Sequence, residues 1–269
     1  MAAAGREAFQ IVIPARFGST RLPGKPLRML AGKPLLQHVW ERACEARAAS
    51  VVVATDDARI LEAARSWGAV ALMTSEGHRS GTERLAEVAA LLGWEADTIV
   101  VNLQGDEPLV PPALPSQAAA ALVQYPDAGI ATFATRIHSH AELFDTNVVK
   151  VVLRGDGSAT YFSRAPIPWC RDSFARAPDA LPAGVPFLRH IGLYAYRARV
   201  LRRLAEAKAS YCEEAESLEQ LRALSLGIGI RVEVLPVLPG RGVDTEHDLQ
   251  WVEEYLSGRV AGGSGQRGA

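Results

Sequence analysis

Three cationic side chains gather in one short loop near the start of the chain. Arg16, Arg21 and Lys25 lie among glycine and hydroxyl residues in the segment PARFGSTRLPGKPL, directly after the apolar residues 11–13. Small residues allow a ligand to approach the backbone amides, and the cations can neutralise its charge. At the carboxyl end of the first strand of an open α/β sheet, such a loop can wrap a triphosphate. The alternative is a solvated basic loop without a ligand.

This loop matches neither of two widespread phosphate-binding motifs. It contains no GxGxxG and no GxxxxGK[ST]. The first absence argues against hydride transfer with a dinucleotide, and the second argues against P-loop phosphoryl transfer. The loop therefore predicts a nucleotide site of another kind.

Two acidic residues far apart in the chain suit a hard cation. Asp106 follows the apolar residues 99–103 in VNLQGDEPLV, and Asp244 precedes a helical pattern in GVDTEHDL. Mg²⁺ usually takes one or two carboxylates, and phosphate oxygens and water complete its shell. From the residues alone, Asp244 is more readily interpreted as a helix N-cap, although Thr245 could cap instead. We assign Glu107 an indirect or structural role.

Two polar segments at strand–helix junctions, VVATDD and HRSGTERLAE, carry further groups suited to a nucleotide. Arg79, Ser80 and Gly81 precede a helix whose unpaired amides and positive end favour anions. We therefore expect triphosphate or cytosine contacts there. The alternatives are helix capping for Thr82 and a surface ion pair for Arg84.

The elements that must position these loops alternate between strand and helix in the first half of the chain, which is typical of a parallel sheet. Strands are expected at 9–15, 50–55, 70–73, 98–103 and 129–136, and helices at 35–47, 58–67, 82–92 and 114–125. In the second half, the strands 148–153 and 159–163 flank a GDG turn, which favours an antiparallel hairpin. A mobile loop at 169–186, a strand at 190–196, helices at 200–207 and 216–226, a strand at 232–238 and a helix at 248–256 follow.

Composition limits the classes of partner. The 29 Lys and Arg against 30 Asp and Glu leave a net charge of −1, so no overall basic field attracts nucleic acid or an anionic membrane. The apolar stretches are too short to span a bilayer, and the first residues do not resemble a signal peptide, which predicts a cytoplasmic protein. The three cysteines are expected to be reduced and structural.

The loop PARFGSTRLPGKPL resembles the signature of nucleotide-sugar nucleotidyltransferases, in the version found in 3-deoxy-manno-octulosonate (Kdo) cytidylyltransferases. The segments VVATDD, HRSGTERLAE, QGDEP, GVDTxxDL, YFSRAPIPW, FLRHIGLYAY and SLEQLR resemble the same family. The similarity runs from about Phe9 to about Leu256, with departures concentrated at 171–185, in the alanine-rich N-terminal extension and in the tail. It implies a Rossmann-like α/β nucleotidyltransferase fold similar to glycosyltransferase A, with a mostly parallel central sheet and an inserted antiparallel subdomain.

The resemblance implies an activity and a domain plan. CMP would pass from CTP to Kdo for lipopolysaccharide biosynthesis, with Mg²⁺ as cofactor and one or two ions bound. A cytidylyltransferase for sialic acid or another 2-keto sugar acid is the enzyme alternative, and a nucleotide-sugar binding protein is the non-enzyme alternative. We expect a flexible extension at 1–8, a single domain at 9–258 and a disordered tail at 259–269. A sugar-binding and dimerisation subdomain at about 138–227 implies a homodimer.

The resemblance also implies roles for individual residues. Catalytic roles fall to Lys25, Arg16 and Asp106, and metal ligation to Asp106 and Asp244, which reverses the preference for a cap at Asp244. The expected nucleotide contacts are Ala15, Arg16, Ser19, Lys25, Thr55, Asp56, Arg79, Ser80, Gly81 and Gln104. The expected sugar contacts are Gln104, Arg164, His190, Tyr194, Glu219 and Gln220. Taken alone, His190 is more readily a hydrogen-bonded strand histidine, and Glu219 a solvated helix residue.

Overall fold

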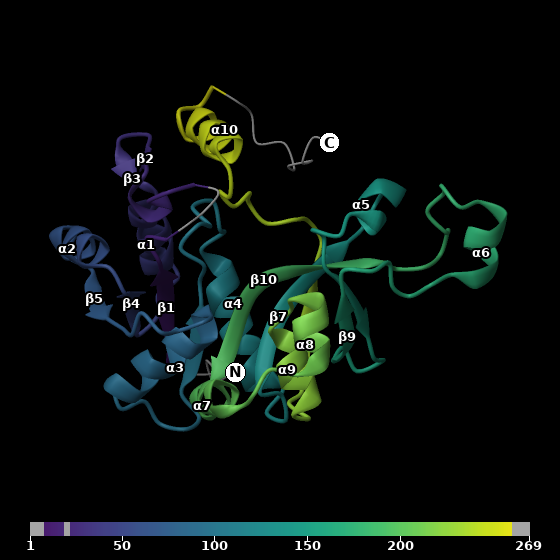
Figure 1. The fold of residues 1–269 in the computed structure, drawn as a ribbon, viewed down its shortest axis with the longest axis horizontal. Helices are drawn as coiled ribbons and strands as arrows, with labels where there is room; N and C mark the ends of the chain where they lie inside the picture. The colour runs from purple at the N-terminus through teal and green to yellow at the C-terminus, as the bar shows by residue number, and fades with distance from the viewer. Residues whose placement is uncertain (1–7, 19–21, 260–269) are drawn as a thin grey trace, which may run out of the picture.

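A nine-stranded sheet runs through the part of the chain that the structure, a computed structural model, describes, namely residues 8–18 and 22–259 (Figure 1). The order along its main path is β11-β7-β10-β6-β1-β4-β5, with bounds Ile230–Leu235, Ile130–Arg136, Leu188–Arg197, Ile99–Asn102, Phe9–Ala15, Ser50–Thr55 and Val70–Met73. On this path β10 runs antiparallel to both of its neighbours, while the other pairs are parallel. The predicted α/β class with a mostly parallel sheet is therefore confirmed.

Helices cover both faces of the sheet, which explains why the strand residues read as continuous apolar runs. In β1, Ile11 and Ile13 pack into one buried cluster, and Val12 packs into the other. The first cluster includes residues of α1 (Leu35–Glu45), α2 (Ala58–Ser66) and α4 (Ala113–Gln124). The second includes residues of α3 (Gly81–Leu91), α7 (Ala198–Glu206) and α9 (Gln220–Ser225).

The predicted antiparallel hairpin forms from β8 (Lys150–Leu153) and β9 (Ala159–Ser163) and joins the sheet where Lys150 pairs with Arg189 of β10. Lys150 is buried, and its ammonium donates to the carbonyl oxygens of Asp145, Val148 and Arg164 at 2.9, 2.6 and 2.5 Å. This buried cation therefore links the hairpin to the loop before it.

Two expectations for the second half were wrong in detail. The segment predicted as a mobile loop contains α6 (Arg171–Arg176), because Phe174 is buried against Phe187 and anchors it. Figure 1 shows α6 at the tip of a projecting arm. The helix predicted at 216–226 is shorter than expected and corresponds to α9, because Ser217 takes a left-handed conformation with φ 51° and separates it from the preceding helix α8 (Tyr211–Glu216).

Several short elements were not predicted from sequence, namely the 3₁₀ helix η1 (Lys25–Leu27), β2 (Met29–Leu30), β3 (Lys33–Pro34) and α5 (His140–Phe144). The last helix, α10, begins slightly earlier than expected and spans Glu246–Leu256. Among the described residues, no helix combines the length and apolar character that a bilayer crossing requires.

Candidate active site

The loops predicted to bind a nucleotide meet at one edge of the sheet. Ala15 and Thr55 end the parallel neighbours β1 and β4 and are paired in register. A Cβ atom added to Gly81, at the start of α3, would lie 3.6 Å from Pro14 Cγ and 3.7 Å from Asn102 Nδ2. The start of α3 therefore abuts the carboxyl ends of β1 and β6. This is where ligands bind in open α/β sheets.

Lys25 brings the two predicted metal ligands together at this edge. Its ammonium nitrogen lies 2.6 Å from Asp106 Oδ2 and 3.1 Å from Asp244 Oδ1, and it also donates to the carbonyl oxygen of Val243 at 3.0 Å. The backbone amide of Val243 donates to the carbonyl oxygen of Asp106 at 2.8 Å, which ties the two acidic loops to each other. One lysine and two carboxylates from distant parts of the chain thus form a single cluster.

The charges in this cluster stabilise one another. Burial disfavours the charged form of Lys25, but attraction by Asp106 and Asp244 and the hydrogen bonds to them outweigh it and raise the pKa of Lys25 above its usual 10.5. Lys25 therefore remains a cation throughout the physiological range.

A capping network holds the loop that carries Asp244. Thr245, and not Asp244, is the N-cap of α10, and it forms a capping box with Asp248. Asp248 Oδ2 also accepts from the backbone amide of Asp244 at 3.1 Å, and Arg241 forms a 2.6 Å ion pair with Asp248. The side chain of Asp244 is therefore turned towards Lys25 while its backbone is held by the cap.

The carboxylates of Asp106 and Asp244 are suitable ligands for a magnesium ion. Their oxygens already face one cation, the ammonium of Lys25. The described residues contain no group of three or more His, Cys, Asp or Glu side chains arranged to hold a metal. Two carboxylates suit Mg²⁺ because phosphate oxygens and water complete its coordination.

A buried arginine holds Asp56, another predicted nucleotide residue. Arg84 is fully buried, so the alternative of a surface ion pair is wrong. It forms a 2.6 Å ion pair with Asp56 and donates to the hydroxyl of Thr74. Arg16 approaches the same carboxylate from the solvent side, with its Nε atom 3.9 Å away. Arg84 thus links α3 to the carboxyl end of β4.

We expect Arg84→Met to lower the free energy of unfolding by about 3 kcal/mol, because it leaves Asp56 largely buried beside an apolar side chain. Urea denaturation would measure the loss. Arg79→Met is the matched control, since Arg79 is 68% exposed in its ion pair with Glu83 and should lose less than about 1 kcal/mol. Equal losses in the two variants would show that burial of Arg84 contributes little.

Ser80 and Glu219, which the sequence placed in different subsites, are in direct contact. The hydroxyl of Ser80 donates to Glu219 Oε1 at 2.6 Å, and that of Thr82 donates to Glu219 Oε2 at 2.9 Å. Ser80 is also the N-cap of α3, so Thr82 is not the cap. Glu219 is therefore a half-buried bridge between α3 and the start of α9, and its interpretation as a solvated helix residue is wrong.

The ring of His190 packs against side chains from neighbouring strands of the sheet. Its ring packs edge-on to Phe162 at 5.1 Å between centroids and lies 5.2 Å from the ring of Tyr194. The hydroxyl of Thr132 lies 3.1 Å from His190 Nε2 and also reaches the carbonyl oxygens of Ile191 and Leu193. Because a hydroxyl has one proton and those carbonyls accept it, Nε2–H donates to Thr132 and Nδ1 is left as an acceptor.

Burial lowers the pKa of His190 to about 3, so the imidazole is neutral at physiological pH. In the unfolded chain the pKa of His190 is near 6.5, so the unfolded state takes up a proton at this imidazole before the folded state does as the pH falls. We therefore expect the free energy of unfolding to fall between about pH 6.5 and about pH 3, and to fall less in His190→Gln. Urea titrations of both proteins across this range would measure the difference, and parallel curves would contradict it.

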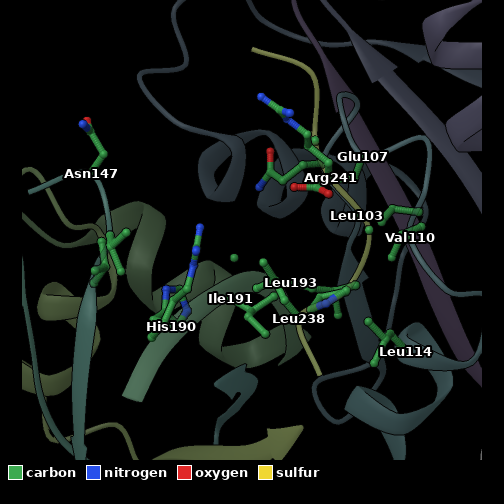
Figure 2. Close-up of a pocket in the computed structure, with 18 residues that line it drawn as sticks. Leu103, Glu107, Val110, Leu114, Asn147, His190, Ile191, Leu193, Leu238 and Arg241 are labelled. Atoms are coloured by element: carbon green, nitrogen blue, oxygen red, sulfur yellow. The ribbon is translucent and has the colours of Figure 1, made fainter. Parts of the chain in front are cut away.

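A cavity of about 270 Å³ lies beside His190. It is bordered by β10 and by the segments 103–110 and 238–242, and Figure 2 shows His190 across from Glu107 and Arg241. Gln104, predicted to bridge nucleotide and sugar, lines the same cavity. The cavity therefore connects the loop that carries Asp106 to the strand that carries the predicted sugar residues.

Three other residues predicted to contact the sugar, Tyr194, Arg164 and Gln220, do not line this cavity. The hydroxyl of Tyr194 is buried without a hydrogen-bond partner among the described residues, and burial raises its pKa. Arg164 directs its guanidinium to the carbonyl oxygens of Glu216, Thr146 and Ser217, at 2.7, 2.9 and 3.5 Å. Gln220 begins α9. Ser19 lies outside the described residues.

Sequence reasoning missed several groups that shape the site. Thr132 orients His190, and the carbonyl of Val243 accepts from Lys25. Gly240 seats the 238–242 segment against Leu109. The only signal for these in the sequence is the pair of glycines in PGRGVDT, which marks a tight passage of the backbone. The three cysteines are free, but Cys44 is exposed and not buried as a structural cysteine would be.

Comparisons with known proteins show which proteins this chain is similar to. A family model described as cytidylyltransferase matches residues 10–230. A 3-deoxy-manno-octulosonate cytidylyltransferase of Pseudomonas syringae pv. syringae is 54% identical over 251 residues, covering 93% of this chain and 99% of that protein. One from Pseudomonas fluorescens is 55% identical over 249 residues, covering 93% and 98%. A solved structure of CMP:2-keto-3-deoxy-manno-octonic acid synthetase complexed with CTP superposes with a TM-score of 0.85 at 42% identity, covering 94% of this chain and 100% of that one.

Proposed function

Because the chain belongs to the cytidylyltransferase family, we propose that it transfers CMP from CTP to Kdo, giving CMP-Kdo and pyrophosphate. The observation that carries this proposal is the meeting of Lys25 with Asp106 and Asp244 at the nucleotide edge of the sheet. A non-catalytic binding protein would have no need of two carboxylates held against one cation. The similarity to named cytidylyltransferases over nearly the whole chain supports the same activity.

In the proposed reaction the anomeric hydroxyl of the sugar attacks the α-phosphorus of CTP in line and releases its proton to solvent, while the bond from the α-phosphorus to the bridging oxygen breaks and pyrophosphate leaves. Arg16 directly follows β1, and Lys25 contacts Asp106 in the loop after β6, so both would neutralise charge on the phosphoryl oxygens. Asp106 and Asp244 would hold Mg²⁺. An ion held by these two carboxylates would supply further charge neutralisation and would make the sugar hydroxyl more acidic. The two acidic loops are tied through Val243, which keeps their carboxylates in a fixed relation.

Sugar recognition is proposed for the group around His190. Nδ1 of the neutral imidazole can accept from a sugar hydroxyl, and the buried hydroxyl of Tyr194 has no hydrogen-bond partner within the described ranges 8–18 and 22–259. Glu219 contributes to the raised pKa of Tyr194 and so lies in the same group. Gln104 lines the cavity between this group and Asp106. Arg164 orders the chain around Glu216 and Ser217, next to Glu219.

The proposal is tested by pyrophosphate release from CTP and Mg²⁺ with Kdo as acceptor, and by competition with sialic acid. We expect release with Kdo and a much lower specificity constant for sialic acid. A preference for sialic acid would favour the sister activity on another 2-keto sugar acid. Binding of CTP without release of pyrophosphate from any sugar acid would favour the nucleotide-sugar binding protein.

We further propose a cytoplasmic homodimer whose product enters lipopolysaccharide biosynthesis. The family resemblance supports contact through the segment at about 138–227. In that segment the exposed side chains of Trp169 and Phe144 lie together with ring centroids 6.5 Å apart. Sedimentation of the purified chain would measure the oligomeric state, and a monomer at micromolar concentration would contradict the dimer.

A further inference from the structure

We propose that Lys25 is the resident cation of the nucleotide-free site and keeps divalent ions from the carboxylates of Asp106 and Asp244. The inference rests on the proposed function, because it assigns those two carboxylates to the metal. It concerns the state before the nucleotide binds, in which the ammonium and a divalent ion compete for the same oxygens. Divalent metal would then enter the site together with the triphosphate.

The ammonium of Lys25 is fully satisfied where it lies. A lysine ammonium has three donor hydrogens, and the structure provides it with three acceptors. These are Asp106 Oδ2 at 2.6 Å, Asp244 Oδ1 at 3.1 Å and the carbonyl oxygen of Val243 at 3.0 Å. The side chain is 15% exposed, so solvent offers it few replacement partners. A divalent ion would have to break these contacts to bind.

Charge balance leads to the same conclusion. Two carboxylates that face one point repel each other, and a single positive charge between them relieves part of that repulsion. Without the ammonium of Lys25 between them, the two carboxylates would attract a divalent ion more strongly. With Lys25 in place, a divalent ion close to the ammonium is repelled by it. The lysine therefore lowers the affinity of the empty site for a divalent cation.

The triphosphate removes this obstacle because it offers Lys25 other acceptors. Lysine carries its charge on a flexible stem with several rotatable bonds, so the ammonium can turn from carboxylate to phosphate oxygens. Lys25 starts η1 directly after Gly24, which lies in the left-handed region with φ 66°. Lys25 therefore begins η1 at the edge of the sheet where the predicted nucleotide-binding residues lie.

The test is a titration of nucleotide-free protein with Mn²⁺, in which electron paramagnetic resonance reports the unbound ion. We expect Lys25→Met to bind Mn²⁺ at least about tenfold more tightly than the wild type. Lys25→Gln should behave in the same way and serves if the methionine variant folds poorly. Lys25→Arg keeps the charge and should retain the weak binding of the wild type. Lys33→Met is the matched control, because Lys33 pairs with Glu41 on the exposed surface and should leave Mn²⁺ affinity unchanged.

Two outcomes would contradict the proposal, and they differ in meaning. If the neutral variants bind Mn²⁺ no more tightly than the wild type, Lys25 does not exclude the ion, and the proposal that the carboxylates hold it with nucleotide present is unaffected. If affinity rises but Lys25→Met combined with Asp106→Asn keeps the gain, the ion binds elsewhere. The second result would remove Asp106 from the proposed metal site as well.

Discussion

Asp106→Asn is expected to lower turnover of CTP and Kdo by at least about a thousandfold, because it removes one of the two charges proposed to hold the metal over the triphosphate. The carboxylate is 31% exposed and contributes no volume to the apolar core, so the fold should persist. Pyrophosphate release would measure the activity, and thermal unfolding would measure the stability. Asp244→Asn should have the same effect, because its carboxylate faces the same cation.

The control for this prediction is Asp172→Asn, which removes the same charge from a side chain that is 82% exposed on α6. It should leave turnover unchanged. Near-normal pyrophosphate release by Asp106→Asn and Asp244→Asn would refute the metal assignment. A loss of activity accompanied by unfolding would instead assign the carboxylates a structural role.

Gly240→Ala is expected to lower turnover by at least about a hundredfold, although Gly240 has no side chain to offer a substrate. A Cβ atom at this position would overlap the carbonyl oxygen of Leu109 and would lie 2.5 Å from its Cβ atom. Because backbone cannot move aside as a flexible side chain can, the 238–242 segment would have to shift. That segment leads directly to Val243 and Asp244, and small displacements of catalytic groups are costly.

The expected signature of this variant is a fall in kcat with the fold retained, which circular dichroism and thermal unfolding would check. Gly155→Ala provides the comparison. Its added Cβ meets nothing within 4 Å, so turnover should not change. Normal turnover by Gly240→Ala would mean that the segment can move without displacing Asp244. The hydrogen bond between Val243 and Asp106 would then be sufficient to hold Asp244 in place.

The elements of the first half were predicted well because each carries its own periodic pattern. Strands β1, β4 and β5 have the bounds expected from their apolar runs. The second half was harder to predict, because short elements there depend on distant contacts. The helix α6 depends on burial of Phe174 against Phe187, and the break between α8 and α9 depends on the backbone of Ser217. Neither the packing of Phe174 nor the backbone conformation of Ser217 produces a periodic pattern in the local sequence.

The sequence by itself determined the alternation of strands and helices, the chemistry of each loop and the resemblance to the cytidylyltransferases. Only the tertiary structure decided which loops face one another. It placed Lys25 against carboxylates 81 and 219 positions away, joined Ser80 to Glu219, and buried Arg84 beneath Asp56. The physical reason is that periodicity reports which side of an element is buried, whereas contacts between distant loops depend on how the sheet and helices pack around them.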